Sequence, residues 1–275
     1  MAEPLGADAV RRALEEDRAR DDVTTRLLGP LAERTATGTF VVEEACVVAG
    51  LPVAAEVFMQ LDASTSFDSL VEDGARVSPD TTLATVRGPA STLLAGERTA
   101  LNFLQRLSGI ATATRVAVDA IEGTGAAISD TRKTTPGLRE LEKYAVRIGG
   151  GENHRASLAD AVLWKDNHWH LLAEGALADV VRSAPPGVPV VVEVETEVQF
   201  AAALEAGVTR ILVDNAPPER VASWVHRAGP NVAIEASGGI VPETALAYAR
   251  AGARYISIGA LTHSARSVAI RFDMA

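Results

Sequence analysis

Residues 190–214, VVVEVETEVQFAAALEAGVTRILVD, decide the fold class of this chain. They contain an apolar run at Val190–Val192, a helical pattern over Val198–Ala206 and a second apolar run at Ile211–Val213. Short apolar runs separated by a helix are typical of a right-handed βαβ unit, which pairs its two strands in parallel. This stretch therefore predicts one unit of a parallel α/β sheet.

The same alternation extends to both sides of this unit. Four further apolar runs are expected to form strands: Ala126–Asp130, Ala161–Trp164, Val232–Ala236 and Tyr255–Ile258. Helices are expected at Pro136–Ile148, Leu171–Ser183, Pro218–Ala228 and Pro242–Ala251. Each of the six runs ends in a polar or glycine residue, which favours a barrel-like sheet with its site at the carboxyl ends of the strands. A doubly wound open sheet would gather such residues at one switch point instead. The pattern predicts an enzyme.

The bulk composition narrows the class of protein. The 275 residues are 47% hydrophobic and 4% aromatic, with a net charge of −10, and this acidic balance argues against a general nucleic-acid binder. Cys46 is the single cysteine, so no internal disulfide can form, as suits the cytoplasm. The charged amino terminus does not have the apolar centre of a signal peptide, and no apolar stretch has the length of a membrane helix. We expect a soluble, cytoplasmic protein without a membrane partner.

A different pattern precedes the α/β repeat. Helices are expected at Arg11–Ala19, Leu51–Phe58 and Ser91–Leu107, and strands at Thr35–Cys46, Val71–Val77 and Thr81–Arg87, the last two joined at residues 78–80. The strand-like tail Val268–Met274 is expected to return to this part. The prediction is an α+β domain over residues 1–107, joined by 267–275, and an α/β barrel domain over 108–266.

Positively charged residues are frequent between residues 131 and 168, which contain seven Lys or Arg and five Asp or Glu. A local excess of positive charge in an acidic chain favours a small polyanionic substrate. Three of these cations, Arg139, Lys143 and Arg147, have helical spacing with Glu140 and Glu142. A solvated helix face is the preferred interpretation for Lys143 and Arg147, whereas Arg139 stays open. Arg132 and Lys133 follow a strand end, where no helix face exists.

Glycine-rich segments mark three loops. Gly149–Arg155, GGGENHR, has more glycines than a helix cap requires and leads into polar groups, which favours a ligand-contacting loop. Ser237-Gly238-Gly239-Ile240 and Gly259-Ala260 follow the last two expected strands. Their backbone N–H groups can bind phosphate, with a tight turn as the alternative.

Glu193 and Asp214 end neighbouring expected strands. Their carboxylates can hold Mg²⁺ against phosphate oxygens, act as acid or base, or pair with Lys133 and Lys165. Glu195 is expected on the same face of its strand as Glu193. The pattern does not favour zinc, because the His168/His170 pair has no third ligand at a familiar spacing.

At these residues the sequence resembles the quinolinate phosphoribosyltransferase family, the carboxylating nicotinate-nucleotide pyrophosphorylases of NAD synthesis. The resemblance covers nearly the whole chain. It rests on DDVTT at 21–25, ERTALNFLQ at 97–105, DTRKTTPGLRELEKY at 130–144, GGGENHR at 149–155, KDNH at 165–168, VEVET at 192–196, DN at 214–215, EASGGI at 235–240 and ALTHS at 260–264.

The resemblance implies an amino-terminal α/β sandwich, completed by the carboxyl tail, followed by an incomplete, TIM-like α/β barrel. It implies a homodimer with a shared active site and leaves higher assembly open. Quinolinate and phosphoribosyl pyrophosphate are the implied substrates, with Mg²⁺ and no organic cofactor. The implied catalytic residues are Lys133, Glu193 and Asp214, of which the two acids also serve as metal ligands.

The implied substrate contacts divide into two sets. Arg98, supplied by the partner, would meet the quinolinate carboxylates together with Arg132, His154, Arg155 and Lys165. The 5-phosphate of the second substrate would lie against Ser237, Gly238, Gly239 and Gly259. Thr131 and His263 are further implied substrate contacts. The nucleotide formed is nicotinate mononucleotide, with release of pyrophosphate and CO₂.

Three positions depart from the family pattern. Trp164 and Trp169 flank KDNH, where aliphatic residues are more usual, and Glu152 places an acid in the GGGENHR loop. If Glu152 or Trp164 faced the pocket, the specificity for quinolinate would be affected, but core packing or a solvent-facing direction is the preferred interpretation for each.

Two alternatives to the family's reaction are a relative that acts on another pyridine carboxylic acid and a silent phosphate-sugar sensor. The presence of Lys133, Glu193 and Asp214 argues against the sensor.

Overall fold

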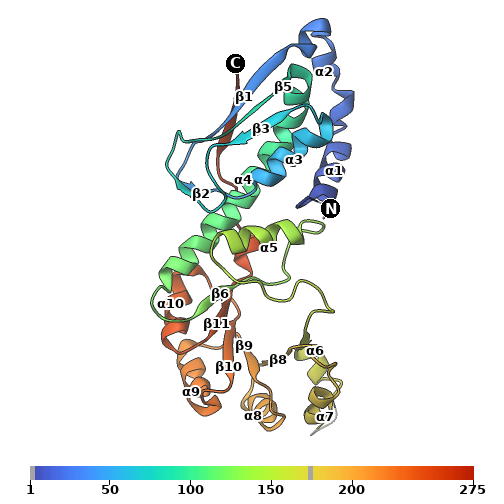
Figure 1. Ribbon diagram of the computed structural model, residues 1–275. Helices are drawn as coiled ribbons and strands as arrows, with labels where there is room; N and C mark the ends of the chain where they lie inside the picture. The colour runs from blue at the N-terminus through green and yellow to red at the C-terminus, as the bar shows by residue number, and fades with distance from the viewer. Residues whose placement is uncertain (1–3, 173–175) are drawn as a thin grey trace. The chain divides into compact units, whose positions relative to one another are not determined.

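The computed structural model describes residues 4–172 and 176–275, which divide by their contacts into two compact units (Figure 1). The first unit contains the chain through Ala113 together with Thr135–Gly150 and Ser264–Ala275. The second contains Thr114–Thr134 and Gly151–His263. The division falls within helix α4 (Ala90–Ala120). The domain boundary predicted at residues 107/108 divides the sequence at a single point, and it stays a prediction. The contacts instead group residues 135–150 with the first unit.

The first unit is built on a four-stranded antiparallel sheet of order β12-β1-β5-β3. Its strands are β1 (Thr35–Val42), β3 (Ser66–Ser69), β5 (Thr82–Pro89) and β12 (Ile270–Met274). The tail strand pairs with β1, placing Phe40 opposite Phe272, with 4.8 Å between their ring centroids. Phe58 and Phe67 complete this aromatic core, so the sheet is held by burial of large side chains from all parts of the unit.

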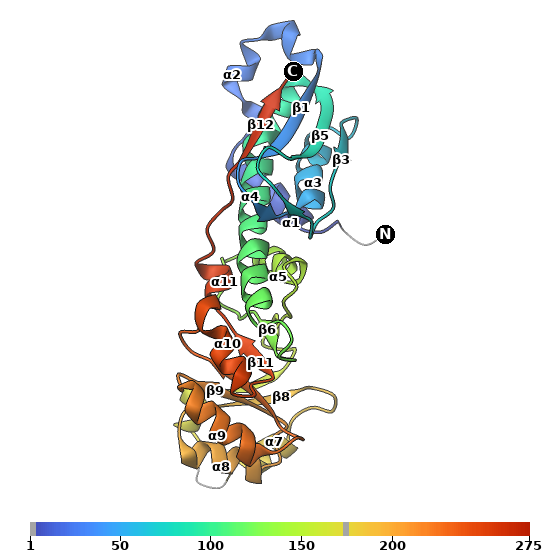
Figure 2. The same ribbon diagram turned by 90° about the vertical axis from the view of Figure 1, so that its left-hand side faces the viewer.

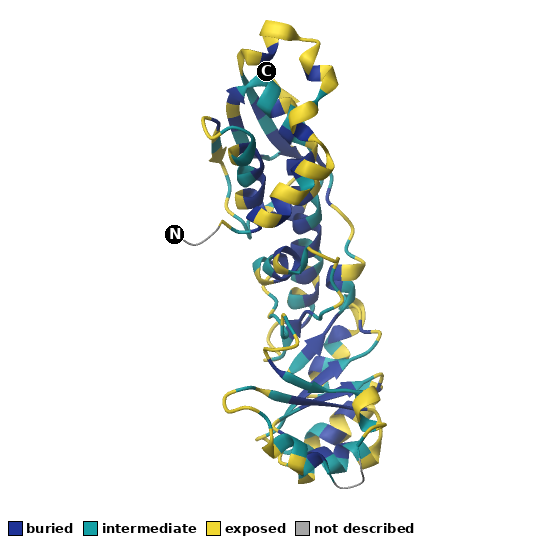
Figure 3. Cartoon of the chain, turned by 90° about the vertical axis from the view of Figure 1, so that its right-hand side faces the viewer, coloured by how far each residue is buried: buried dark blue, intermediate teal, exposed yellow. Residues whose placement is uncertain are grey.

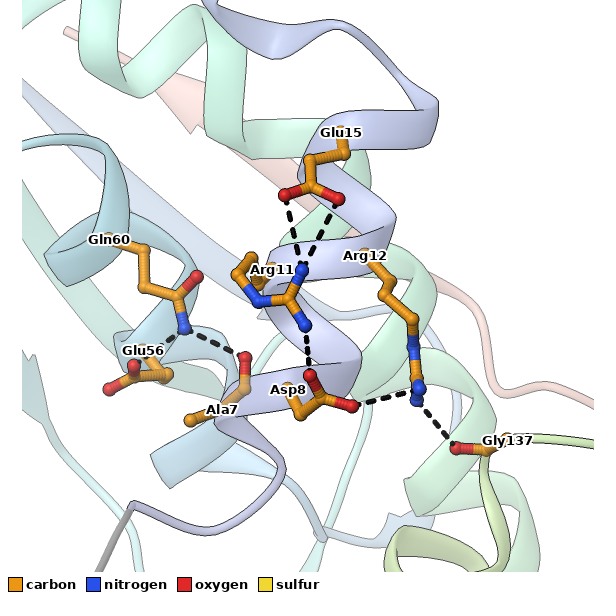
Figure 4. A network of polar contacts seen from close by, with 8 residues as sticks. All are labelled: Ala7, Asp8, Arg11, Arg12, Glu15, Glu56, Gln60 and Gly137. Atoms are coloured by element: carbon orange, nitrogen blue, oxygen red, sulfur yellow. Dashed lines mark hydrogen bonds and ion pairs between the residues drawn. The ribbon is translucent and has the colours of Figure 1, made fainter.

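The first unit also contains helices. They are α1 (Ala7–Glu16), α2 (Val23–Arg26), α3 (Leu51–Leu61), α4 and α5 (Arg139–Ile148), with 3₁₀ turns at Ala19–Asp21 and Gly29–Glu33. Figure 4 shows Arg12 of α1, which pairs with Asp8 at 2.8 Å and donates to the Gly137 carbonyl at 3.3 Å. Through such contacts the segment before α5 belongs to the first unit.

The second unit contains a six-stranded sheet of order β6-β11-β10-β9-β8-β7, in which every pair is parallel. The strands are β6 (Ala127–Ser129), β7 (Val162–Trp164), β8 (Val190–Val194), β9 (Arg210–Asp214), β10 (Ala233–Ser237) and β11 (Tyr255–Ser257). Since β6 and β7 stand at opposite ends of this order, the sheet is an incomplete barrel, as expected.

Helices of the second unit follow strands β7 to β11 along the chain. They are α6 (Asp166–Trp169), α7 (Leu177–Arg182), α8 (Glu197–Glu205), α9 (Pro218–Ala228), α10 (Pro242–Arg250) and α11 (Ala260–His263). Helices α8, α9 and α10 pack on β8, β10 and β11 (Figure 2). The strands between them are largely buried, as Figure 3 shows, so the middle of the sheet forms the core.

The six runs that predicted the parallel sheet are all strands, which confirms the fold class. Three expectations for the elements were wrong. Val71–Val77 contains only β4 (Arg76–Val77), which pairs with β2 (Cys46–Val47) and not with β5. The helix expected at 171–183 is shorter in its described part, α7, and residues 173–175 of that prediction lie outside the described residues. Lys143 and Glu142 are buried in the first unit, so α5 does not present them as a solvated face.

Candidate active site

A cavity of about 330 Å³ opens where the strands of the second unit end. All six strands contribute to its wall, directly or through the residues that follow them. The lining residues are Thr131, Arg132, Lys133, His154, Arg155, Leu163, Lys165, Glu193, Leu212, Asp214, Glu235, Ser237 and Ser257. Convergence of polar groups at the carboxyl ends of parallel strands is typical of a site in a barrel-like fold. Nine of the predicted site residues meet here.

Two guanidinium groups form the cationic part of the wall. The Nε atoms of Arg132 and Arg155 are buried and have no hydrogen-bond partner among the described residues. Arg155 donates from Nη1 to the Ala161 carbonyl at 3.0 Å. Burial, and next the charge of Arg132, lowers the pKa of Arg155. Buried donors without acceptors are costly, so this wall is suited to an anionic ligand that would pair with both.

Asp130 positions the loop that carries His154. Its buried carboxylate accepts hydrogen bonds from the His154 backbone N–H at 2.8 Å and from Asn153 Nδ2 at 2.6 Å. The imidazole Nδ1 of His154 accepts from the Arg155 backbone N–H at 2.8 Å. With Nδ1 used as an acceptor, the proton of a neutral ring is on Nε2, which lies 3.6 Å from Glu235 Oε1.

Lys165 and Glu193 form an ion pair at the pocket wall, with 2.5 Å between Nζ and Oε2. Burial raises the pKa of Glu193, and the bond from Lys165 opposes this shift. Asp214 ends the neighbouring strand β9 and accepts from Asn215 Nδ2 at 2.7 Å. The two acids therefore lie at adjacent strand ends, as predicted. Glu195 lies beyond the end of β8 and is exposed, so the expected strand alternation does not reach it.

Glu235 lines the pocket and is fully buried. Its Oε2 accepts from Arg210 Nε at 2.9 Å and lies 2.9 Å from Arg210 Nη2 in an ion pair. Its Oε1 accepts from the Ser257 hydroxyl and lies 3.6 Å from His154 Nε2. These side chains come from four different segments, so they form a polar layer inside a sheet that also buries many apolar side chains.

The glycine-rich turns lie next to the pocket. Gly238 has φ +94°, and a Cβ there would lie 2.5 Å from the Asn215 backbone nitrogen, so only glycine fits. Gly239 has φ +61° with open space around it. A Cβ on Gly259 would lie 3.1 Å from Lys133 Cδ and 3.2 Å from His263 Nε2, which brings these three predicted residues together.

The remaining sequence expectations are placed as follows. Arg98 is exposed and belongs to the first unit, where it lines a separate cavity of about 680 Å³ with Arg12 and Arg106. Glu152 is exposed and bridges to Ser129 beside β6, and neither it nor Trp164 lines the pocket.

Among residues 4–172 and 176–275, no three His, Cys, Asp or Glu side chains group as a metal site. No helix in that part of the chain has the length and apolarity to cross a membrane.

Sequence profiles of one family match both parts of the chain. The profile described as "Quinolinate phosphoribosyl transferase, N-terminal domain" matches residues 22–108, and the profile of the C-terminal domain matches residues 110–273. The chain belongs to this family. The confirmed fold and the family agree with the resemblance found in the motifs.

Relatives match along nearly the whole length. The nicotinate-nucleotide pyrophosphorylase [carboxylating] of Mycobacterium leprae is 45% identical over 97% of this chain and 96% of its own. The protein of Bacillus subtilis described as probable nicotinate-nucleotide pyrophosphorylase [carboxylating] is 41% identical over 94% and 90%. The crystal structure of NadC from Streptococcus pyogenes is similar with a TM-score of 0.92 at 37% identity, covering 98% of this chain and 96% of that one.

Sequence reasoning missed the residues that act from inside the sheet. Asp130, Arg210, Glu235 and Ser257 were not assigned roles, although the first and third lie within motifs of the family. One signal was available: Glu235 interrupts an otherwise apolar strand, Ala233–Ser237, at a position that must face a buried partner.

Proposed function

We propose that the protein transfers the phosphoribosyl group of phosphoribosyl pyrophosphate to quinolinate, with loss of CO₂, and so forms nicotinate mononucleotide in NAD synthesis. One observation carries the substrate assignment: the buried Nε donors of Arg132 and Arg155, which have no acceptor among the described residues, stand in one pocket with Lys165, His154 and the exposed Lys133. A planar ring with two adjacent carboxylates supplies acceptors for both guanidinium groups. Leu163 and Leu212 supply apolar surface for the ring itself.

The second substrate is assigned to the opposite part of the same pocket. Ser237, Gly238, Gly239 and Gly259 follow β10 and β11, where backbone N–H groups can meet a phosphate. Lys133 and His263 lie beside Gly259, so their positive charge or hydrogen bonds would add to this phosphate contact. In this arrangement the ribosyl carbon faces Glu193 and Asp214.

The proposed reaction follows from these charges. The bond between the ribosyl carbon and pyrophosphate breaks, and the carbon develops positive charge that Glu193 and Asp214 stabilise. The pyridine nitrogen bonds to this carbon, and the ring becomes cationic. The ring then accepts the electron pair of the bond to the adjacent carboxylate, which leaves as CO₂, and a proton takes its place on the ring. The substrate is its own electron sink, so the protein positions the groups and balances their charge.

Mg²⁺ is part of the proposal. Glu193 and Asp214 place carboxylates at adjacent strand ends, and two carboxylates with substrate phosphate oxygens and waters would suit this ion. When bound, Mg²⁺ would offset negative charge on the departing pyrophosphate. The proposal includes no organic cofactor.

A homodimer with a shared site is also proposed, with higher assembly left open. Arg98 supports it: this exposed cation lies in the first unit, whereas the pocket belongs to the second, and the partner's copy would complete the set of cations. We place the enzyme in the cytoplasm, in keeping with one buried, unpaired thiol at Cys46.

A coupled assay tests the proposal. The protein is incubated with phosphoribosyl pyrophosphate, Mg²⁺ and quinolinate labelled in the carboxylate next to the ring nitrogen, and labelled CO₂ and mononucleotide are measured together. Equal amounts of both products are expected. A parallel reaction with nicotinate tests the alternative, since nicotinate can give mononucleotide without CO₂. Turnover of nicotinate but not of quinolinate would overturn the substrate assignment.

A further inference from the structure

Trp169 makes an unusual contact behind the pocket wall. Its indole Nε1 donates to the backbone carbonyl of Glu193 at 2.8 Å. Strand β7 ends at Trp164, which is paired with Val192, so the ladder between β7 and β8 stops one residue before Glu193. The indole therefore continues the connection to β8 at the residue whose side chain lines the pocket.

The helix that carries Trp169 needs such an anchor. Helix α6 spans only Asp166–Trp169, and one turn of helix is not stable by itself in water. Lys165 precedes this turn, and its backbone N–H donates to His168 Nδ1 at 2.9 Å. Trp164 packs against both aromatic neighbours, with ring centroids 5.0 Å from His168 and 6.5 Å from Trp169.

The consequence concerns the ion pair of Lys165 and Glu193. Lys165 Nζ lies 2.5 Å from Glu193 Oε2, and its side chain remains 43% exposed. An exposed lysine has several rotatable bonds, and holding it in one geometry has an entropic cost. Because Trp169 joins the turn after Lys165 to the backbone of Glu193, it fixes the two ends of this pair relative to each other.

We propose that Trp169 is a positioning residue, whose indole N–H···O=C bond to Glu193 holds Lys165 and Glu193 in register at the pocket wall. Trp164 has no such role, because its buried Nε1 has no hydrogen-bond partner among the described residues. The two tryptophans thus differ in the hydrogen bond from the indole N–H to a backbone carbonyl, and they provide a matched comparison. The effect on catalysis rests on the proposed function, whereas the effect on the ion pair does not.

Crosslinking with a carbodiimide tests the contact without any assay of activity. The reagent joins an amine and a carboxylate that touch, forming an amide with loss of water. The chain has three lysines, Lys133, Lys143 and Lys165, so a crosslink to Glu193 is assigned by mass spectrometry without ambiguity. Trp169→Phe keeps the ring and removes the N–H, Trp169→Leu removes both, and Trp164→Phe is the control.

The Lys165–Glu193 crosslink is expected to fall at least about threefold in Trp169→Phe and Trp169→Leu and to remain at the wild-type yield in Trp164→Phe. Circular dichroism identifies the variants that fold, and either Trp169 variant suffices for the comparison. A wild-type yield in a folded Trp169 variant would overturn the proposal.

Steady-state kinetics then test the consequence for the site. Trp169→Phe should raise KM for quinolinate about three- to tenfold and change kcat less, because Lys165 contacts the substrate in the proposed function. Trp164→Phe should stay within about twofold of the wild type. An unchanged KM in Trp169→Phe despite a lost crosslink would refute the positioning role. If the wild type itself does not turn over quinolinate, the proposed function fails, and the crosslink still decides the structural inference.

Discussion

Arg132 and Arg155 repel each other across a shared pocket wall, and their buried Nε donors have no hydrogen-bond acceptor in the described chain. Such a pair destabilises the empty pocket and favours a ligand with two acceptors. Each charge-assisted bond is worth about 1.5–3 kcal/mol, so Arg132→Ala and Arg155→Ala should each lower kcat/KM for quinolinate by about ten- to over a hundredfold. Arg250→Ala, on the exposed part of α10, is the control. Near-normal kinetics in both variants would remove these residues from the substrate site.

Gly238 and Gly239 allow the effect of backbone strain to be separated from the effect of a steric clash. Both have positive φ, but only a Cβ on Gly238 would collide with Asn215. Gly238→Ala should therefore lower the free energy of unfolding by about 1–3 kcal/mol, and Gly239→Ala by less. Urea denaturation of the two variants measures the difference. Equal losses would mean that Asn215 moves aside.

Single residues also show where sequence reasoning ends. Glu193, Asp214 and Lys165 were predictable, because a polar residue directly after an apolar run must lie at a strand end. The partners of Glu235 were not, since Arg210, Ser257 and His154 meet only when four segments pack together. Glu142 was mistaken for a solvated residue for the same reason: its partners, Arg106 and Thr135, come from elsewhere in the first unit.

Strands β8 and β9 bring Glu193 and Asp214 to one edge of the sheet, and this pairing underlies the expected use of metal. Turnover should stop in excess EDTA and return with Mg²⁺. Asp214→Asn should lower kcat more than it raises KM for quinolinate, because its charge matters most when the ribosyl carbon is cationic. Glu195→Gln, one residue beyond β8, should behave as the wild type. Full activity in EDTA would exclude the metal.

The short helix α2 depends on its amino-terminal cap. Asp22 accepts from the backbone N–H groups of Thr24 and Thr25, at 2.9 and 3.1 Å, and from the Thr25 hydroxyl. Asp22→Ala should lower the free energy of unfolding by about 0.5–2 kcal/mol at neutral pH. Asp17→Ala, at an exposed position after α1, is the control.

The effect of the Asp22 cap should depend on pH. The bond from the Thr25 hydroxyl, with the backbone bonds, lowers the pKa of Asp22. A lowered folded-state pKa gives stability above the unfolded value that is lost as the pH falls through the folded value. Denaturation at neutral and acid pH should therefore show the wild type and Asp22→Ala converging in acid. A constant difference would mean that the charge of the cap is not what stabilises α2.

Among helices and strands, prediction succeeded where periodicity was strong. The parallel strands are short apolar runs with helices between them, and each was placed to within a few residues. β4 was assigned to the wrong neighbour, because a turn at residues 78–80 looks like a hairpin whether or not its strands pair. Its actual partner, β2, is a two-residue strand that no periodic pattern can reveal.

At the scale of the whole molecule, we predict a homodimer in which each active site contains residues from both chains. Arg98→Ala and Lys133→Ala proteins should each be inactive, but a mixture should regain activity through hybrid dimers that contain one intact site. Random exchange between equal amounts gives about a quarter of the wild-type activity. Mass spectrometry of tagged subunits confirms the exchange. No recovery after proven exchange would mean that each chain builds its own site.

The tail strand β12 also has a consequence for biosynthesis. β1 receives its partner on one side only when Ile270–Met274 has been made, 180 residues after β5 ends at Pro89. At roughly 5–20 residues per second, translation of residues 90–269 takes about 9–36 s. During this time the nascent chain presents an open β edge near the ribosome, which is a hazard for aggregation. The first sheet to be started is therefore the last to be finished.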